Sequence, residues 1–280
     1  DRPVDPDGGQ VWGLGRTAAL EFPRRWGGLV DLPAVLDARA AGRFAAALVG
    51  GEDQVAVRAS GLFARRLRRA GVLEAPRGEW CPAGPVVITG GTGALGAEVA
   101  RWLARRGVGK LVLVSRRGPE APGAAELVAE LAELGAVAVV VACDVADREA
   151  LAVVVAEHAV VGVVHAAGVV EARPLGETGV GDFAEVVRAK VLGAAHLDAL
   201  LPDAELFVLF SSVAGVWGSG GQAAYAAGNA YVDGLAERRR ARGAVATAVA
   251  WGPWAEAGML VEGDAEEHLR RRGLIPMNPA

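Results

Sequence analysis

Apolar runs and amphipathic segments alternate along the chain from Pro85 onward. Six almost continuously apolar runs lie at residues 85–89, 111–115, 136–142, 161–165, 206–210 and 245–250. Unbroken runs of this length are typical of strands that are covered on both faces. Between them, helical stripes are formed by Leu95, Val99, Trp102 and Leu103 and by Leu127, Leu131 and Leu134, and further helices are expected over 183–201 and 225–242. Strand and helix in turn predict an α/β fold with a parallel, doubly wound sheet.

The first 74 residues follow a different pattern. A helix is expected over 11–22, a short strand over 28–32, a helix over 40–49 and one or two strands over 54–69, with proline and glycine at the joints. This set has few apolar elements for a core of its own. We therefore expect a first unit over 1–74, a linker over 75–84 and a main unit over 85–280.

Composition narrows the class of protein. The chain has 280 residues, 29 basic and 33 acidic groups and a hydrophobic fraction of 52%, which allows a sizeable core and gives no reason to expect nucleic acid as a partner. Cys81 and Cys143 lack the spacing of a disulfide framework or zinc site, which fits a reducing cytoplasm. Residues 1–10 are too polar for a signal peptide. Residues 206–232 are uncharged but carry too many polar groups for a membrane span.

A glycine-rich turn follows the first strand of the main unit. The segment TGGTGALG, residues 89–96, contains the G-x-G-x-x-G spacing as Gly91, Gly93 and Gly96 between a strand and a helix. Glycines let the backbone approach a pyrophosphate, and the helix N-terminus supplies amide donors, so this turn predicts a dinucleotide site.

The ends of the next two strands bear on the choice of nicotinamide cofactor. The second strand ends in Ser115, Arg116 and Arg117 rather than in an acidic residue, and a guanidinium there favours the 2′-phosphate of NADPH. The alternative is an ordinary surface arginine pair. After the third strand, Asp144 is placed to accept from the adenine amino group or to cap the next helix.

Two scarce residue types occur among the candidate catalytic groups. Lys110 and Lys190 are the two lysines, and Tyr225 and Tyr231 are the two tyrosines. Carbonyl reduction by hydride needs a proton donor, and a nearby ammonium would lower the pKa of a tyrosine towards that task.

Four residues near the strand at 206–210 fit this chemistry. Tyr225 would be the acid, Lys190 its cation, Ser212 a carbonyl hydrogen-bond donor and Asn229 a residue that orders a water. Singly, each has another interpretation: Ser212 as a helix cap, Asn229 as a surface amide, Tyr225 as core and Lys190 as a solvated charge. No metal site is expected, and His165 is interpreted as a core residue.

The motifs together resemble a known family. TGGTGALG, LVSRRG, CDVAD, VVHAAGV, FSSVAGVWGSGGQAAYAAGNAYVDGLA and VAWGPWAEAGM are similar to the ketoreductase domain of modular type I polyketide synthases, within the short-chain dehydrogenase/reductase superfamily. Ordinary members of that superfamily carry lysine four residues after the tyrosine. This chain has Asn229 there and lysine upstream at 190, an exchange typical of synthase ketoreductases.

The resemblance implies a Rossmann-like catalytic subdomain over 85–280, with a lid near 257–275, after a partial non-catalytic structural subdomain over 1–74. It implies NADPH as the cofactor and a β-ketoacyl thioester on an acyl carrier protein as the substrate, with other synthase domains as partners. The implied catalytic residues are Tyr225, Ser212, Lys190 and Asn229. The implied cofactor contacts are Thr89, Gly91, Thr92, Gly93, Leu95, Gly96, Ser115, Arg116, Asp144, Val145, Ala166, Ala167, Gly168 and Pro253.

The resemblance also implies a stereochemical outcome. Family members that give the D-alcohol carry an LDD motif after HAAGV, where this chain has Val170, Glu171 and Ala172. It has instead Trp217, the mark of the L-alcohol or A-type class, and Gln222, which suggests the A1 subtype without epimerisation. The other interpretation of Trp217 is a core aromatic.

Two other functions remain open from the sequence. The chain could be a non-reducing structural or interaction module, as its short first unit suggests. It could also be a free-standing short-chain dehydrogenase for a small alcohol, which the exchange of Asn229 and Lys190 disfavours.

Overall fold

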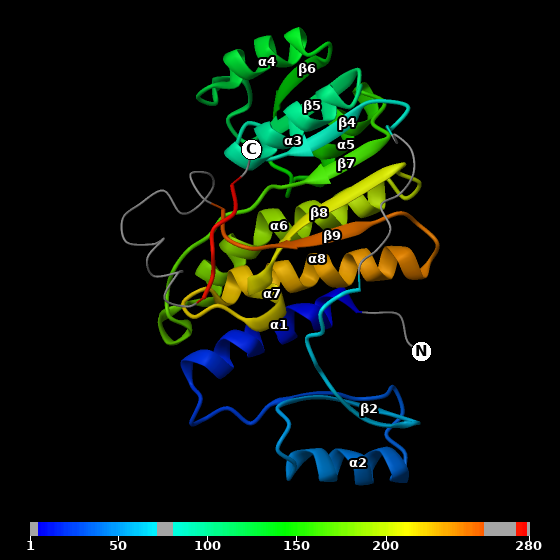
Figure 1. The fold of residues 1–280 in the computed structure, drawn as a ribbon, viewed down its shortest axis with the longest axis vertical. Coiled ribbons are helices and arrows are strands. Elements are labelled where there is room, and N and C mark those ends of the chain that lie inside the picture. Colours follow the sequence, from blue (N-terminus) through cyan, green and yellow to red (C-terminus); the bar gives the residue numbers. More distant parts are fainter. Residues whose placement is uncertain (1–4, 72–80, 255–272, 279–280) are drawn as a thin grey trace.

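A six-stranded parallel sheet forms the centre of the main unit (Figure 1). The computed structural model describes residues 5–71, 81–254 and 273–278. The sheet has the order β6-β5-β4-β7-β8-β9, so the chain winds outward from β4 and then returns to build the other half from β7. This order confirms the predicted doubly wound fold. Its strands are β4 (Val86–Thr89), β5 (Lys110–Ser115), β6 (Val137–Ala142), β7 (Gly162–His165), β8 (Leu206–Ser212) and β9 (Thr247–Trp251).

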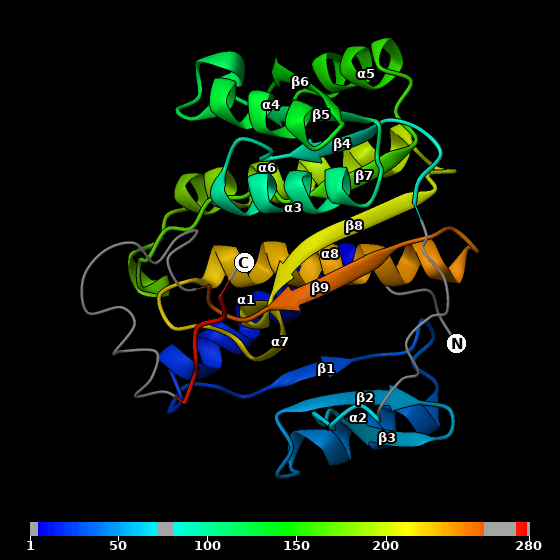
Figure 2. The same ribbon diagram turned by 45° about the horizontal axis from the view of Figure 1, so that its top comes forward.

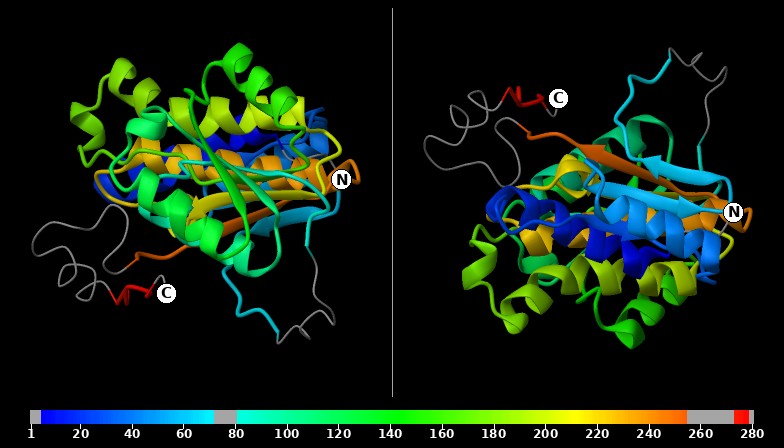
Figure 3. Two further views of the ribbon diagram at one scale, coloured as in Figure 1. Left: turned by 90° about the horizontal axis from the view of Figure 1, so that it is seen from above. Right: turned by 90° about the horizontal axis from the view of Figure 1, so that it is seen from below.

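Helices cover both faces of this sheet, as the view from above shows (Figure 3). One face carries α3 (Ala94–Arg105) and α4 (Ala124–Glu133), and the other carries α5 (Arg148–Glu157), α6 (Val180–Leu200) and α8 (Ala223–Ala241). Because side chains alternate along a strand, Ile88 and Leu113 pack towards α3 and α4, whereas Val87 and Val112 pack towards the other helices. Continuous apolar strands thus build two cores.

Some local expectations differ from the structure. The pattern predicts neither α5 nor the five-residue α7 (Val213–Trp217), nor the short 3-10 helices η1 (Gly118–Glu120) and η2 (Leu175–Glu177). Trp102 is not part of the buried stripe of α3: it is 51% exposed and lies against the Arg106 guanidinium. The buried stripe runs instead through Ala100, Leu103 and Ala104, because small side chains let this helix lie close to the sheet.

The first unit is a small sheet with two helices (Figure 2). It contains α1 (Pro6–Glu21), β1 (Leu29–Asp31), α2 (Ala38–Leu48), β2 (Gln54–Arg58) and β3 (Gly61–Ala64), in the sheet order β1-β2-β3. The helix α1 begins before residue 11 because Asp5 caps it and Pro6 occupies its first turn.

The helix α1 packs along α8 of the main unit (Figures 1 and 2). Gly9 and Gly13 face the backbone of α8, where a Cβ on Gly9 would lie 2.8 Å from the carbonyl oxygen of Ala230. The first unit therefore gains much of its contact from its neighbour, in agreement with its sparse apolar pattern.

The domain boundaries at 74 and 85 stay predictions. Most of the expected linker, at 75–84, and most of the expected lid, at 257–275, fall outside the described residues. Among the helices that the structure describes, none is both long and apolar enough to cross a membrane.

Candidate active site

The nucleotide end of the site begins where β4 ends. Gly93 is the N-cap of α3, and its amide donates to the carbonyl oxygen of Gly90 at 2.9 Å. A Cβ at Gly96 would lie 2.8 Å from the Cα of Gly91, closer than side chains approach, so the first helical turn packs directly on the loop. The helix N-terminus therefore faces the groove at close range and suits an anionic pyrophosphate.

A groove of about 540 Å³ extends from this loop across the ends of β5 and β6. The expected cofactor residues that line it are Thr92, Gly93, Leu95, Gly96, Ser115, Arg116, Asp144, Val145, Ala166, Ala167 and Gly168. Gly91 is buried in the turn beneath it, and Pro253 lines the neighbouring catalytic cavity. The groove therefore collects most of the residues that the sequence assigns to the cofactor.

Thr89 and His165 support the floor of the groove. Both are fully buried, and the Thr89 hydroxyl lies 2.7 Å from Nδ1 of His165 while Nε2 lies 3.0 Å from the carbonyl oxygen of Lys190. Burial, followed by the Lys190 ammonium, lowers the pKa of His165 to about 3. The ring is therefore neutral, with Nε2 donating to the carbonyl and Nδ1 accepting from Thr89.

Charged side chains stand at the far end of the groove. Arg116 is exposed and has no hydrogen bond or ion pair to other described residues. Asp144 accepts from the amide of Ala146 at 2.9 Å and pairs with Arg188. Burial would raise the pKa of Asp144, but these two partners outweigh it and hold that pKa below its usual value. Both Asp144 oxygens thus have protein partners, and an adenine contact stays a prediction.

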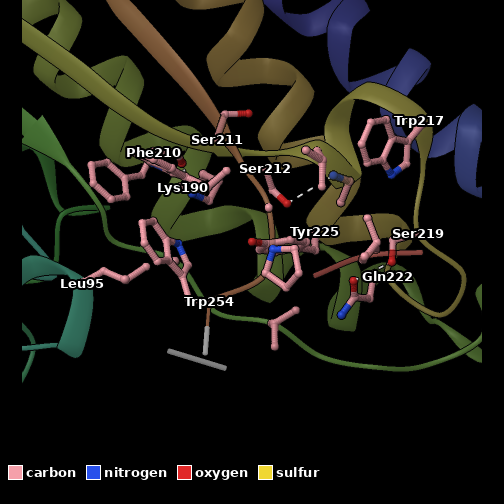
Figure 4. Close-up of a pocket in the computed structure, with 18 of the residues that line it drawn as sticks. Leu95, Lys190, Phe210, Ser211, Ser212, Trp217, Ser219, Gln222, Tyr225 and Trp254 are labelled. Atoms are coloured by element: carbon pink, nitrogen blue, oxygen red, sulfur yellow. Dashed lines mark hydrogen bonds between the residues drawn. The ribbon is translucent and has the colours of Figure 1, made fainter. Parts of the chain in front are cut away.

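A second cavity of about 230 Å³ adjoins the groove and shares Leu95, Ala166 and Gly168 with it. Lys190, Ser212 and Tyr225 line it, whereas Asn229 lies just behind, fully buried in α8. Figure 4 shows Lys190 on one side of Tyr225 and the side chains of Trp217, Ser219 and Gln222 on the other. The structure thus brings three of the four expected catalytic residues to one cavity.

Tyr225 lies in the first turn of α8, next to the end of β8. Burial raises the pKa of Tyr225, partly offset by the Ser212 hydroxyl and the Asn229 side chain. Lys190 does not lower this pKa in the structure, in contrast to the expectation from the sequence. Tyr225 is therefore a protonated phenol at neutral pH, ready to act as an acid.

Ser212 and Asn229 each make a hydrogen bond to nearby backbone and also lie at or next to the catalytic cavity. The Ser212 hydroxyl caps α7 by accepting from the amide of Ala214 at 3.2 Å, as the alternative interpretation holds, and it also lines the cavity. Asn229 Nδ2 donates to the Tyr225 carbonyl at 2.8 Å. Its Oδ1 is buried without a partner among the described residues, so Asn229 is not a surface amide.

Lys190 is held in α6 by a single described hydrogen bond. Its side chain is buried, and Nζ donates to the Phe210 carbonyl at 2.8 Å. Burial lowers the pKa of Lys190 to about 8, although the carboxylate of Asp233 acts in the opposite direction. The solvated-charge interpretation is therefore wrong, and the ammonium titrates close to neutral pH.

Trp217 and Gln222 lie at the rim of the catalytic cavity. Trp217 is 43% exposed and lines the cavity, so the core interpretation of this residue is wrong. Gln222 precedes α8 and accepts from the Ser219 hydroxyl at 2.8 Å. Trp251 and Trp254 pack against each other on the opposite wall, with ring centroids 5.0 Å apart.

Sequence reasoning missed Arg188, which lines the nucleotide groove and pairs with Asp144. Its position in α6 carries no motif, and the two residues lie 44 positions apart. The arginine bias of the chain also hides a functional arginine among many others, so no sequence signal singles it out.

Two family models match the chain. Residues 84–256 match the KR domain, and residues 1–67 match the Rossmann fold domain of the polyketide synthase extender module SpnB. These ranges fall on the main unit and the first unit respectively.

The curated relatives are polyketide synthases. Erythronolide synthase EryA3 of Saccharopolyspora erythraea is 57% identical over 99% of the chain, and the pikromycin synthase component PikAIII of Streptomyces venezuelae is 53% identical over all of it. The chain spans 9% and 18% of the length of these two relatives.

Solved structures of ketoreductases are also similar to this chain. PlmKR1, a ketoreductase from the first module of phoslactomycin biosynthesis in a Streptomyces species, superposes with a TM-score of 0.94 at 51% identity, over 100% of this chain and 66% of that one. An A1-type ketoreductase gives 0.93 at 48% identity, over 98% and 60%. A C2-type ketoreductase is also similar, at 0.88 and 49%, over 98% and 61%.

Proposed function

Since the chain belongs to the KR domain family of modular polyketide synthases, whose members are nicotinamide-dependent reductases of the short-chain dehydrogenase/reductase type, we propose that it reduces a β-ketoacyl thioester on an acyl carrier protein to the L-β-hydroxyacyl thioester with NADPH. One observation carries the proposal. Lys190, Ser212 and Tyr225 line a single cavity that is continuous with a glycine-rich nucleotide groove.

The residues of the groove fit a dinucleotide. The close approach of Gly96 to the loop lets the α3 N-terminus hold the pyrophosphate, and the exposed Arg116 is free to bind a 2′-phosphate. When bound, the cofactor supplies the hydride that reaches the β-carbon of the substrate.

Residues of the catalytic cavity donate a hydrogen bond and a proton to the oxygen of the reacting carbonyl. The Ser212 hydroxyl donates a hydrogen bond to it, and Tyr225, kept protonated by its raised pKa, donates the proton that forms the alcohol. The Lys190 ammonium, which is charged below a pH of about 8, would stabilise the phenolate that remains once Nζ turns towards it from the Phe210 carbonyl. The unpartnered Oδ1 of Asn229 is available to order the water that restores this proton.

Direct evidence for this chemistry would come from Tyr225→Phe. We expect reduction of a β-ketoacyl N-acetylcysteamine thioester to fall by about a hundredfold or more, since the proton donor is lost. The affinity for NADPH should stay close to that of the wild type, because the nucleotide groove is unchanged. Initial rates of NADPH consumption and cofactor titration by fluorescence measure the two quantities.

Tyr231→Phe is the matched control, because it removes the other tyrosine hydroxyl from the same helix. Tyr231 is buried in the core and lines neither cavity, so we expect near wild-type turnover. If Tyr225→Phe kept most of its activity, the proposed role of the phenol would be wrong. A folded wild-type chain without NADPH consumption would favour a non-reducing module.

The L-configuration, and the A1 subtype, are proposals that rest on Trp217 and Gln222 at the cavity rim. Chiral chromatography of the reduced thioester tests them together with activity. A D-alcohol would contradict the A-type assignment, and an epimerised α-methyl group would contradict the A1 subtype.

The expected setting of the enzyme is part of the same proposal. The synthase relatives support other synthase domains as neighbours, and the acyl carrier protein would present the substrate on its phosphopantetheine arm. Cys81 and Cys143 are both free thiols, which is compatible with a reducing cytoplasm.

A further inference from the structure

The last turns of α1, in the first unit, contact the backbone beside the catalytic cavity. Thr17 and Glu21 are four residues apart and therefore share one face of the helix. Thr17 accepts from the amide of Ser219 at 3.3 Å, and Arg16 next to it donates to the Gly215 carbonyl. Gly215 and Ser219 lie on either side of Trp217, so α1 holds both ends of the segment that carries this tryptophan.

Glu21 binds two separate loops with one carboxylate. Its Oε1 accepts from the amide of Gly221 at 2.8 Å, and its Oε2 accepts from the amide of Leu175 at 2.7 Å. The same two loops also meet directly, because the amide of Arg173 donates to the Gly221 carbonyl at 2.7 Å. A charged acceptor between two backbone donors makes both hydrogen bonds stronger than neutral ones.

Both of these loops form walls of the catalytic cavity. One continues from Val170 and the other runs from Trp217 to Gln222, and all three side chains line the cavity. Figure 4 shows Trp217, Ser219 and Gln222 together beside Tyr225. Under the proposed function, an acyl thioester would approach the phenol between these walls, so their separation would affect how it enters.

The backbone of the second loop does not fix its own position. Gly218 has φ of +83° and Gly221 has φ of +75°, a left-handed region that glycine enters readily. A Cβ at Gly218 would lie 2.7 Å from the carbonyl oxygen of Arg16, so α1 and the loop are in direct contact. Two glycines make the loop pliable, and α1 supplies the contacts that fix it.

We propose that Glu21 is a positioning residue for substrate selection: by joining the loops at Leu175 and Gly221, it fixes the rim formed by Trp217 and Gln222 and so the carbonyl face that meets the cofactor. This inference rests on the proposed function. It gives the first unit a part in stereochemical control, through a residue that touches neither substrate nor cofactor.

Glu21→Gln tests the proposal with little change in shape. The amide nitrogen of glutamine is a donor, so one of the two backbone amides loses its acceptor. For an α-methyl-β-ketoacyl N-acetylcysteamine thioester we expect KM to rise about tenfold, equivalent to about 1.4 kcal/mol. The share of the minor stereoisomer should increase, whereas kcat changes less and the affinity for NADPH stays constant. Thr17→Val, which removes the acceptor for Ser219, should shift KM and stereochemistry in the same direction.

Glu177→Gln is the matched control, since Glu177 is an exposed carboxylate two residues after Leu175 without a described side-chain contact. It should leave KM, kcat and stereochemistry unchanged. Wild-type KM and product composition in both Glu21→Gln and Thr17→Val would overturn the proposal. An equal loss of kcat and NADPH affinity in Glu21→Gln would also overturn it, because that result indicates a general structural role.

Hydrogen exchange separates a failure of this inference from a failure of the proposed function. In Glu21→Gln, the amides of residues 171–177 and 218–222 should exchange faster than in the wild type, while those of β4 and β5 stay unchanged. Unchanged exchange in both loops would overturn the role of Glu21 whatever the activity. Faster exchange in a protein whose wild type reduces no thioester would instead overturn the proposed function, and with it the substrate-selecting role.

Discussion

Lys190 is a buried ammonium beside a phenol, and its protonation state sets a pH limit for the reaction. Burial lowers the pKa of Lys190 from 10.5 to about 8, so its charge is complete well below that pH and disappears as the pH rises through it. We expect kcat/KM for thioester reduction to fall above a pH of about 8, because the uncharged amine no longer stabilises the phenolate of Tyr225. Initial rates across a pH series measure this alkaline decrease of kcat/KM, the alkaline limb of the pH profile.

Lys110→Met is the control for this pH dependence, since it removes the other lysine of the chain at the start of β5, away from both cavities. Its profile should match that of the wild type. Lys190→Met should be slow and should lack the alkaline limb. A wild-type profile that stays flat well above pH 8 would contradict the assignment of this pKa.

Arg116 tests the cofactor preference at the other end of the site. A charged hydrogen bond is worth about 1.5–3 kcal/mol, so Arg116→Ala should weaken NADPH binding about ten- to a hundredfold. Binding of NADH, which lacks the 2′-phosphate, should change little and serves as the internal control. Equal losses for both cofactors, measured by fluorescence titration, would place the 2′-phosphate elsewhere.

Single residues of the site were predictable where a motif fixes their local position. Ser212 and Tyr225 follow a buried strand and open a helix, and the structure brings both to one cavity. The effect of Lys190 on Tyr225 was not predictable, because it depends on where Nζ points, and Nζ is bonded to the Phe210 carbonyl. The role of Glu21 was also not predictable from the sequence, since its hydrogen-bond partner Leu175 lies 154 positions away.

Among the elements, the contact of α1 with α8 depends on glycine. A Cβ at Gly13 would lie 2.8 Å from the Cα of Ala227, with backbone rather than a flexible side chain as the obstacle. We expect Gly13→Ala to lower the free energy of unfolding by about 2 kcal/mol, since the helices must move apart. Urea denaturation measures the change.

Gly42→Ala provides the opposite case in α2, where a Cβ meets nothing within 4 Å. Alanine is the better helix former by about 0.5–1 kcal/mol, so this variant should be slightly more stable than the wild type. If both variants shifted stability in the same direction, the close packing of α1 on α8 would not explain the effect at Gly13.

Helices and strands were predictable from the sequence where a continuous apolar run is buried on both faces. They were not predictable where an element is short or where side-chain packing determines which residues are buried. The six strands of the main sheet were predictable because both of their faces are covered. The helix α7 was not, because five residues are too few to show a period. Trp102 was assigned to a buried stripe because its spacing fits, but the space under α3 accommodates alanine rather than an indole.

At the scale of the molecule, the catalytic cavity and the contact between the two units share α8. Tyr225 and Asn229 belong to its first turns, and Asp233 follows one turn after Asn229, on the side that faces α1. The carboxyl of Asp233 is surrounded by Ser211, Glu237, Arg16 and Lys190, which come from both units. A charge change at this position therefore affects the stability of the assembled chain.

The last prediction concerns the pH dependence of that stability. Burial is the main cause that raises the pKa of Asp233 from 3.8 to about 6, so the folded chain retains this proton longer than the unfolded one. Stability consequently falls as the pH rises from about 4 to about 6, and the ionised carboxylate costs up to about 3 kcal/mol above that window. Asp233→Asn, which stays neutral, should therefore stabilise the protein at pH of about 8 and have little effect near pH 4. Urea denaturation at both values measures the difference. An equal effect of Asp233→Asn at both values would mean that ionisation is not its cause.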